Sequence, residues 1–412
     1  MKTINYISIA LLLTGLSRVS FAQSFDFGGF IDSYHAVRLQ EPNDFMSSRS
    51  RLRTEVRGAK GNSSFYTSLN ANFNSLLPDR SFVELREAYL EYAGTNWDLR
   101  AGRQIIIWGV SDGIRITDII APMDFTEFLA RDYDDIRMPV DAMKLRFFNN
   151  NYKLELVFVP VFQSFIYPTD SLNPWNIFPG SEAGPELVIT PANTPETTLK
   201  NSEFGGRFSF FLSGIDMSLV SLYTWNKLPV FSTSFSEGND TTFLLPEHHR
   251  LFMAGLDLSA TIGSLVVRGE GAYFKGENYP SDFIGSSNYL ISRDVIRTLL
   301  GLDWYPGGEW TLTGQLSYTS ILKYCEELSC EQHNVLATLG ISKKLLHSTL
   351  LLSTFGYMDL SNKGFFNRTS IDYSLSDPIH LCAGVDLFGG DGGMFGVYKD
   401  NSEVWVKVKY SF

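Results

Sequence analysis

The chain has 412 residues, of which 44% are hydrophobic and 14% aromatic, and its formal net charge is −11. The hydrophobic content is too low for a bundle of membrane helices, and the acidic balance argues against nucleic acid as a partner. The aromatic residues and 34 glycines favour β structure, in either a membrane barrel or a soluble β-sandwich.

The first 22 residues have the pattern of an export signal. Lys2 gives the positive start, residues 7–13 form a short apolar stretch, and a Ser-Phe-Ala cleavage sequence ends at Ala22. The apolar stretch is far shorter than the roughly 20 residues that a membrane helix needs. We therefore expect cleavage near Ala22 and a mature chain, residues 23–412, that forms a single domain.

Alternation with a period of two recurs along the rest of the chain and predicts β-strands. After residue 309, an apolar phase with Trp310, Leu312 and Leu316 alternates with a polar phase that includes Thr311 and Gln315. In a membrane barrel one phase faces lipid and the other faces the lumen, whereas in a sandwich the polar phase faces bulk water. Strand patterning alone leaves both architectures open.

The connections between strands favour the barrel. Short turn sequences alternate with longer connections along the whole chain, as in a barrel with tight turns at one rim and long loops at the other. The short turns are predicted at residues 60–62, 94–96, 149–151, 213–215, 262–264, 306–308, 345–347 and 376–378. The fold prediction is all-β: a transmembrane antiparallel barrel of about 18 strands (16–18), with a last amphipathic strand that ends on an aromatic residue, Phe412.

One predicted strand carries five charged residues on the same phase: Arg49, Arg51, Arg53, Glu55 and Arg57. An arginine that faces lipid costs about 2–4 kcal/mol at the bilayer midplane, so these side chains are expected to line the lumen. They could form a basic ladder that attracts anions. They could also form a structural ladder with carboxylates such as Glu84, Glu87 and Glu91. The same argument places four residues of later strands in the lumen: Arg268, Glu270, Arg293 and Arg297.

Residues 102–140 connect two strands and are too long and too patterned for an idle loop. Apolar residues such as Trp108 and Phe128 could anchor this segment on the barrel wall. We expect it to fold inward after the fifth strand and narrow the pore, although an extracellular cap remains an alternative. Its charged residues would then form the constriction: Asp112, Arg115, Asp118, Asp124, Glu127 and Arg131.

The same region carries a family resemblance. It contains the runs Leu85-Arg86-Glu87-Ala88-Tyr89-Leu90, Gly102-Arg103-Gln104, Trp108-Gly109, Asp112-Gly113, Thr117-Asp118 and Pro122-x-Asp124. These motifs resemble those of a group of poorly characterised porin-like outer-membrane barrels of Gram-negative bacteria. The resemblance covers about 60 residues and implies an architecture, and it does not imply a particular substrate.

The cysteines and histidines give weaker signals. Cys325 and Cys330 lie close together in a polar loop of an exported chain, so we expect a disulfide between them. No metal or cofactor is expected, and the six histidines are scattered, without a hydrolase motif. A hydrolase that uses His333 with Ser317 or Ser342 is a weak alternative.

We therefore expect an outer-membrane channel for passive diffusion of small, possibly charged solutes, in contact with membrane lipid and either monomeric or trimeric. The alternatives are a carrier barrel for a hydrophobic or polymeric substrate, which would have a plugged lumen with an apolar pocket, and a surface adhesin or receptor.

Overall fold

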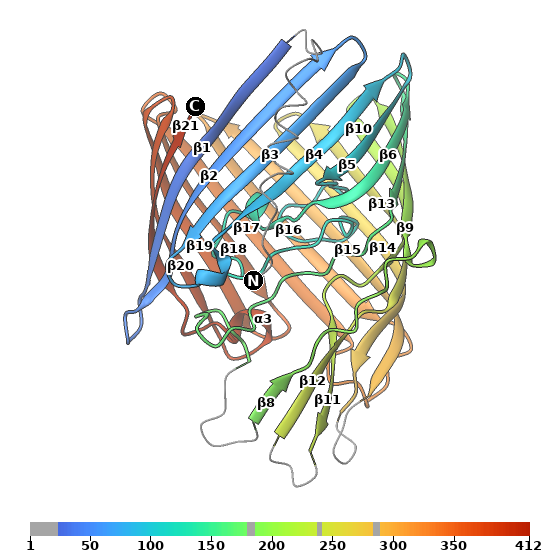
Figure 1. Cartoon of the computed structure of the whole chain (residues 1–412), viewed down its shortest axis with the longest axis vertical. Coiled ribbons are helices and arrows are strands. Elements are labelled where there is room, and N and C mark those ends of the chain that lie inside the picture. The colour runs from blue at the N-terminus through green and yellow to red at the C-terminus, as the bar shows by residue number, and fades with distance from the viewer. Residues whose placement is uncertain (1–23, 179–185, 237–240, 283–288) are drawn as a thin grey trace, which may run out of the picture.

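The computed structural model describes residues 24–178, 186–236, 241–282 and 289–412, so the predicted export signal lies outside the described residues. Eighteen strands form a closed barrel (Figure 1). They are β1 (Ser24–Arg38), β2 (Phe45–Lys60), β3 (Ser63–Asn74), β4 (Phe82–Ala93), β5 (Trp97–Gln104), β6 (Val140–Phe148), β7 (Tyr152–Val159), β9 (Glu203–Leu212), β10 (Ile215–Trp225), β13 (Arg250–Ile262), β14 (Leu265–Pro280), β15 (Leu290–Gly307), β16 (Trp310–Ile321), β17 (His333–Leu345), β18 (Leu350–Asp359), β19 (Gly364–Ser376), β20 (Ile379–Gly390) and β21 (Glu403–Ser411).

The barrel closes between its first and last strands. Every barrel strand is antiparallel to its neighbours, and β1 pairs with β21 from Phe30 opposite Ser411 to Arg38 opposite Glu403. The main chain of Phe412 also exchanges two hydrogen bonds with Gly29, each 3.0 Å long. Closure leaves no unpaired sheet edge, which is the condition for a sheet to span a bilayer. The predicted fold class and strand number are confirmed.

The eight predicted short turns all join neighbouring strands at one rim of the barrel. Gly61 and Gly263 lie in two of these turns with φ angles of +59° and +62°, in the left-handed region that tight hairpins require and that glycine adopts without strain. The longer connections lie at the opposite rim. The longest of them, residues 105–139 and 160–202, follow the fifth and seventh strands.

The burial pattern is the reverse of that in a soluble protein. Leu300 on β15 is 64% exposed, whereas Arg268 and Glu270 on β14 are 7% and 4% exposed. The apolar outer phase recurs around the barrel and continues to β21, where Val404, Val406 and Val408 are exposed. An outer surface of this kind is stable only against lipid, so the strands span a membrane. Within the described residues, no helix is long and apolar enough to cross a bilayer.

Two predicted loops contain strands that the sequence reading missed. β8 (Glu186–Ile189), β11 (Val230–Phe235) and β12 (Thr241–Glu247) form a small separate sheet, in which β8 and β12 are parallel. Figure 1 shows this sheet beyond the barrel at the end with the long loops. The other elements of the described residues are single turns: α2 (Tyr133–Ile136), α3 (Gly393–Gly396), η2 (Pro78–Arg80) and η3 (Leu199–Asn201).

Candidate functional site

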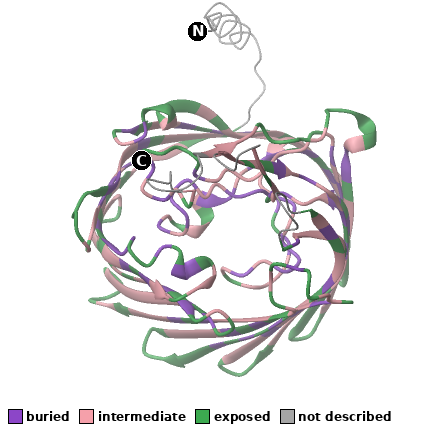
Figure 2. Ribbon diagram, turned by 90° about the horizontal axis from the view of Figure 1, so that it is seen from below, coloured by how far each residue is buried: buried purple, intermediate pink, exposed green. Residues whose placement is uncertain are grey.

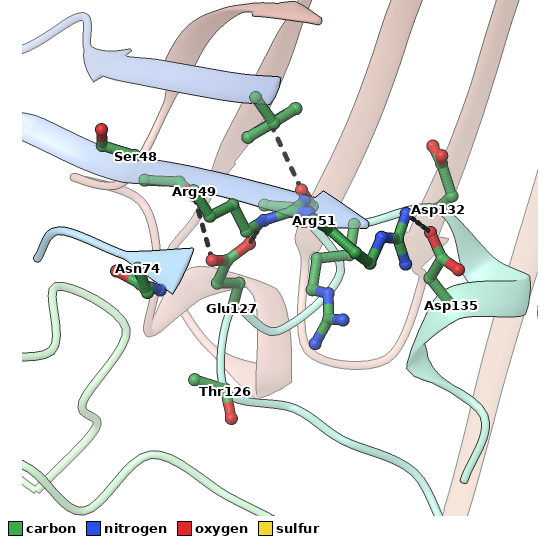
Figure 3. A network of polar contacts seen from close by, with 12 residues as sticks. Ser48, Arg49, Arg51, Asn74, Thr126, Glu127, Asp132 and Asp135 are labelled. Carbon is green, nitrogen blue, oxygen red and sulfur yellow. Dashed lines mark hydrogen bonds and ion pairs between the residues drawn. The ribbon is translucent and has the colours of Figure 1, made fainter. Parts of the chain in front are cut away.

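The arginines of β2 point into the barrel, because their phase is opposite to that of the exposed Leu52. Arg51 is bound on both sides: its guanidinium lies 2.6 Å from Asp32 on β1 and 2.8 Å from Asp135 in the 105–139 segment. Arg53 lies 3.2 Å from the other oxygen of Asp135. Figure 3 shows Arg51 directed at Asp135. Thus β2 and the 105–139 segment share one carboxylate between two guanidinium groups.

The remaining residues of this phase differ in position. Arg49 bonds to Glu127 of the 105–139 segment at 3.1 Å (Figure 3). Arg57 lies at the short-turn end, where its side chain is 62% exposed and 3.6 Å from Glu55. The partners expected from the sequence, Glu84, Glu87 and Glu91, are not the ones used. This part of the prediction is wrong because the inward segment supplies nearer carboxylates than β4 does.

A β-bulge on β4 adds a sixth charge that the sequence reading missed. The pairing with β3 shifts between Ser68 and Leu69, which leaves Arg86 as the extra residue. A bulge redirects the side chain that it inserts. Arg86 reaches the interior, where its Nη2 atom donates a 3.0 Å hydrogen bond to the Asp134 carbonyl. Glu87 also points inward and accepts a 2.9 Å hydrogen bond from the Ile105 backbone amide.

The 105–139 segment is fixed to the wall at β14 by Glu270. The carboxylate of Glu270 accepts hydrogen bonds from the backbone amides of Val110 (2.6 Å), Ser111 (2.7 Å) and Thr117 (3.1 Å). It also accepts one from the Thr117 hydroxyl at 2.9 Å. Backbone amides that converge on one buried carboxylate are strong, charge-assisted bonds. Glu270 therefore holds both ends of the turn at residues 110–117.

Arg268 and Gln315 complete this attachment. Arg268 bonds to Asp112 at 2.6 Å and to the Val110 carbonyl at 2.7 Å, and it is held in turn by Asp303 at 2.6 Å. Gln315 on β16 donates to the Asp112 carbonyl and accepts from its amide, at 2.7 Å and 3.0 Å.

A second attachment lies on the other side of the barrel. Besides the bonds to β2, the Tyr34 hydroxyl on β1, which donates to Glu403 at 2.9 Å, also lies 3.3 Å from the Ala130 carbonyl, and Lys407 on β21 lies 2.7 Å from Asp132. β2 is the second strand of the ring and β14 the eleventh, so eight of the 18 strands lie between them on each side and they face each other. The 105–139 segment therefore crosses the lumen, and Figure 2 shows buried chain inside the ring. The segment thus folds inward, as predicted, and does not form the extracellular cap that was the alternative.

The other predicted constriction residues stiffen the segment itself. Asp118 accepts a hydrogen bond from Arg137 and a 3.1 Å bond from the Trp108 amide. Arg115 donates to the Asp118 and Ala121 carbonyls, both at 2.5 Å. In addition, Asp124 pairs with Arg131 at 3.0 Å. The segment thus carries its own ion pairs as well as its wall contacts.

A narrow cavity of about 100 Å³ lies between the segment and the β2–β5 wall. Its lining includes seven arginines and four carboxylates, an excess of three positive charges in a chain whose net charge is −11. The arginines are Arg49, Arg51, Arg80, Arg86, Arg103, Arg131 and Arg137, and the carboxylates are Glu84, Asp124, Glu127 and Asp135. Among the described residues, no carboxylate lies within 4.0 Å of Arg80 or Arg86. The cavity is therefore locally cationic.

Comparison with known proteins places the chain in a family. Residues 43–381, most of the chain, match the family described as "Protein of unknown function (DUF1302)". The chain belongs to this family. No curated protein matches it by sequence.

Solved structures show the same fold as the DUF1302 chain at low sequence identity. OccK8 (OprE) of Pseudomonas aeruginosa is 8% identical with a TM-score of 0.57, over 96% of this chain and 99% of that one. OccK3 (OpdO) of the same organism is 10% identical with a TM-score of 0.56, over 95% and 97%. OccK2 (OpdF) of P. aeruginosa, solved with glucuronate, is 10% identical with a TM-score of 0.54, over 96% and 99%. The predicted resemblance to porin-like barrels is confirmed.

Three further predictions for the DUF1302 barrel concern residues near the long-loop rim. Arg297 pairs with Glu277 at 2.6 Å, and Arg293 lies 3.0 Å from the Cys325 sulfur. Both arginines are thus engaged with nearby groups. Cys325 and Cys330 are free thiols, so the structure does not support the predicted disulfide. Hydrogen bonds shape this loop instead, including a 2.9 Å bond from the Tyr324 hydroxyl to the Cys330 carbonyl.

The inward segment is expected to keep its position in mild acid. Burial alone would raise the pKa of Asp135, but the hydrogen bond and charge of Arg51 and the charge of Arg53 outweigh it, and the pKa is lowered. Burial alone would also raise the pKa of Asp132, but the charges of Lys407 and Arg368 outweigh burial, and this pKa is lowered too. Carboxylates of lowered pKa stabilise the fold above their ordinary pKa, about 3.9 for Asp, and lose this contribution only as the pH falls towards the lowered value.

The ion pairs of Asp135 and Asp132 should therefore stay formed from about pH 7 to about pH 4, so their loss should change the single-channel conductance only in stronger acid. The measurement is conductance in planar bilayers at stepped pH. In the Asp135→Asn variant, the part of the acid transition that Asp135 causes should be absent. A transition that is already complete at about pH 5 in the wild type and absent in Asp135→Asn would contradict the assignment, because Asp135 remains ionised there.

Proposed function

We propose that the barrel is an outer-membrane, porin-like channel for passive diffusion of small solutes, and that it prefers anions. The observation that carries the proposal is the cationic cavity between the inward segment and the β2–β5 wall. Charged groups that line a narrow pore set its ion preference, and a segment that crosses the lumen sets its size limit. The fold supports the location, because its structural neighbours are outer-membrane porins.

Two further points support a channel over other functions. OccK2, a neighbour in fold alone, was solved with glucuronate, a small organic anion of the class proposed here. His333 contacts the Tyr318 hydroxyl at 2.8 Å and not Ser317 or Ser342, so the hydrolase alternative gains no support from its geometry. We also propose that the chain reaches the membrane after cleavage near Ala22.

The preference for anions can be tested with arginines that hold no carboxylate. We expect the double variant R80Q/R86Q to lower the ratio of anion to cation permeability by at least about tenfold. At an effective dielectric constant of about 20, a charge roughly 10 Å from a passing ion contributes about 1–2 kcal/mol. A change of about 1.4 kcal/mol corresponds to a factor of ten. The measurement is the reversal potential in planar bilayers across a KCl gradient.

The control is R57Q, which removes one positive charge at the exposed short-turn end and should leave the reversal potential almost unchanged. Equal shifts in R57Q and R80Q/R86Q would show that the net charge of the lumen matters and the cavity does not. A cation-selective wild-type channel would reject the proposed preference outright.

A further inference from the structure

The inward segment has a second, chemically different cavity on its other face. A cavity of about 480 Å³ lies towards β15–β18 and opens near the long-loop rim. Most of its lining is apolar or aromatic, and its walls come from the inward segment, the barrel strands and three other connections at the long-loop rim. Representative residues are Ile116, Phe128, Leu336, Tyr357, Phe395 and Tyr398. Such an apolar patch is unexpected in a barrel whose lumen conducts only hydrophilic solutes, since porin interiors are polar.

The walls of this cavity are built and rigid. Phe128 stacks on Tyr398 with ring centroids 4.4 Å apart, and Phe395 lies 5.6 Å from the ring of Tyr357. Trp175, from the 160–202 loop, supports the Tyr398 ring from behind at 5.5 Å. Aromatic contacts between the inward segment, the 391–402 loop and β18 therefore hold the cavity in shape without any ligand.

The charges at the cavity are already neutralised, so it does not select for a charged ligand. Arg297 is held by Glu277, and Arg115 lies 3.6 Å from Asp118 and donates to two backbone carbonyls. Among the described lining residues there is no carboxylate. Ser317, Thr319 and Asn334 place neutral hydrogen-bonding groups on one wall, and tyrosine hydroxyls such as that of Tyr133 add others. A ligand that matches this surface has a hydrocarbon or aromatic body and a neutral polar group at one end.

The apolar cavity also leads inward. Gly113, Leu129, Tyr133 and Tyr357 line both this cavity and an adjoining cavity of about 610 Å³. The lining of the adjoining cavity also includes Arg131, Asp132 and Arg368. At the boundary, the Tyr133 hydroxyl is buried and makes no hydrogen bond to the described residues. A buried hydroxyl without a partner is costly, and a ligand oxygen that passes the boundary would satisfy it.

We propose that this cavity is a binding site for small, neutral, amphipathic molecules that enter from the long-loop side and pass along the face of the inward segment opposite the cationic cavity. Its size falls within the range of sites for drug-sized ligands, which are mostly apolar with a few placed polar groups. A role of this site in transport rests on the proposed channel function, whereas binding of a ligand at the site does not depend on it. The barrel would then offer a cationic route for small anions and an apolar one for amphipathic molecules.

The test uses the full-length mature protein in lipid nanodiscs, with 1-adamantanol as the probe and glucose as a hydrophilic compound of similar size. Titration calorimetry, corrected with empty nanodiscs, should show saturable binding of 1-adamantanol and none of glucose. The double variant M394Q/V397T adds polar atoms at the exposed lip of the cavity and should weaken binding by about tenfold. The matched control L346Q changes an exposed apolar residue in a short turn and should bind like the wild type.

A second readout separates this inference from the proposed function. In planar bilayers, 1-adamantanol added on the long-loop side should interrupt the current in a concentration-dependent manner, and R80Q/R86Q should keep this block. Absence of saturable binding, or equal binding by M394Q/V397T and the wild type, would overturn the site even if the channel conducts anions. Saturable, M394Q/V397T-sensitive binding to a barrel that conducts no ions would support the site and reject the channel.

Discussion

Substitution of Glu270 by alanine is expected to raise the single-channel conductance and the open-channel noise. Glu270 is 4% exposed and accepts three backbone amides and a hydroxyl from the turn at residues 110–117. Hydrogen bonds to a charged group contribute about 1.5–3 kcal/mol each. If loss of the carboxylate costs the attached state about 3 kcal/mol, the balance between attached and released segment changes by more than a factor of one hundred.

The control variants separate release of the segment from loss of a charge. Glu270→Gln keeps one acceptor oxygen and should give an intermediate conductance. Glu55→Ala removes the same charge from the lumen phase of β2, at a site that contacts Arg57 and not the inward segment, and should leave the noise unchanged. A normally folded Glu270→Ala barrel with wild-type conductance would show that Arg268, Gln315 and apolar packing hold the segment alone.

The barrel itself was predictable because its signals are local. Alternation over a few residues identifies each strand, and a turn sequence such as the one at Gly263 identifies the hairpin that joins two strands. Lumen and lipid phases follow from the cost of charge in the bilayer, so Arg51 and Leu52 could be assigned to opposite faces from sequence alone. The small sheet β8–β11–β12 was missed because its strands are short and two of them pair across a long separation in sequence.

The side-chain partners inside the lumen were not predictable, because they depend on which segments meet in space. Arg51 and Asp135 are separated by 84 positions in the sequence. The strand carboxylates that looked plausible as partners of Arg51 bind other groups; Glu84, for example, accepts a hydrogen bond from the side-chain amide of Asn70. One signal for Arg86 was present. Glu84 and Glu87 both suit the lumen but lie on opposite phases, which requires a bulge between them. The apolar cavity had no such signal, since its walls come from separate loops and strands.

The arginines have two proposed roles, to stabilise the fold through ion pairs and to attract anions, and these roles can be assigned to different residues. Arg51 is 6% exposed and lies between Asp32 and Asp135, whereas Arg86 is half-buried and bonds only to a backbone carbonyl. Loss of one member of a buried ion pair costs about 3–5 kcal/mol, because the other charge stays buried without a partner. We therefore expect Arg51→Gln to lower the free energy of unfolding by about this amount, and Arg86→Gln to change it by less than about 1 kcal/mol.

Urea unfolding in lipid vesicles measures these free energies, and the reversal potential gives the ion preference of the same variants. The double variant D32N/R51Q removes both charges and should recover part of the lost stability, since Asp32 no longer remains as an unpaired anion. Arg86→Gln should shift the reversal potential more than D32N/R51Q, which leaves the net charge of the lumen unchanged. Equal losses of stability in Arg51→Gln and Arg86→Gln would contradict this assignment of roles. The assignment makes Arg51, between two carboxylates, the structural arginine, and Arg86, which pairs with no carboxylate, the one that acts on solutes.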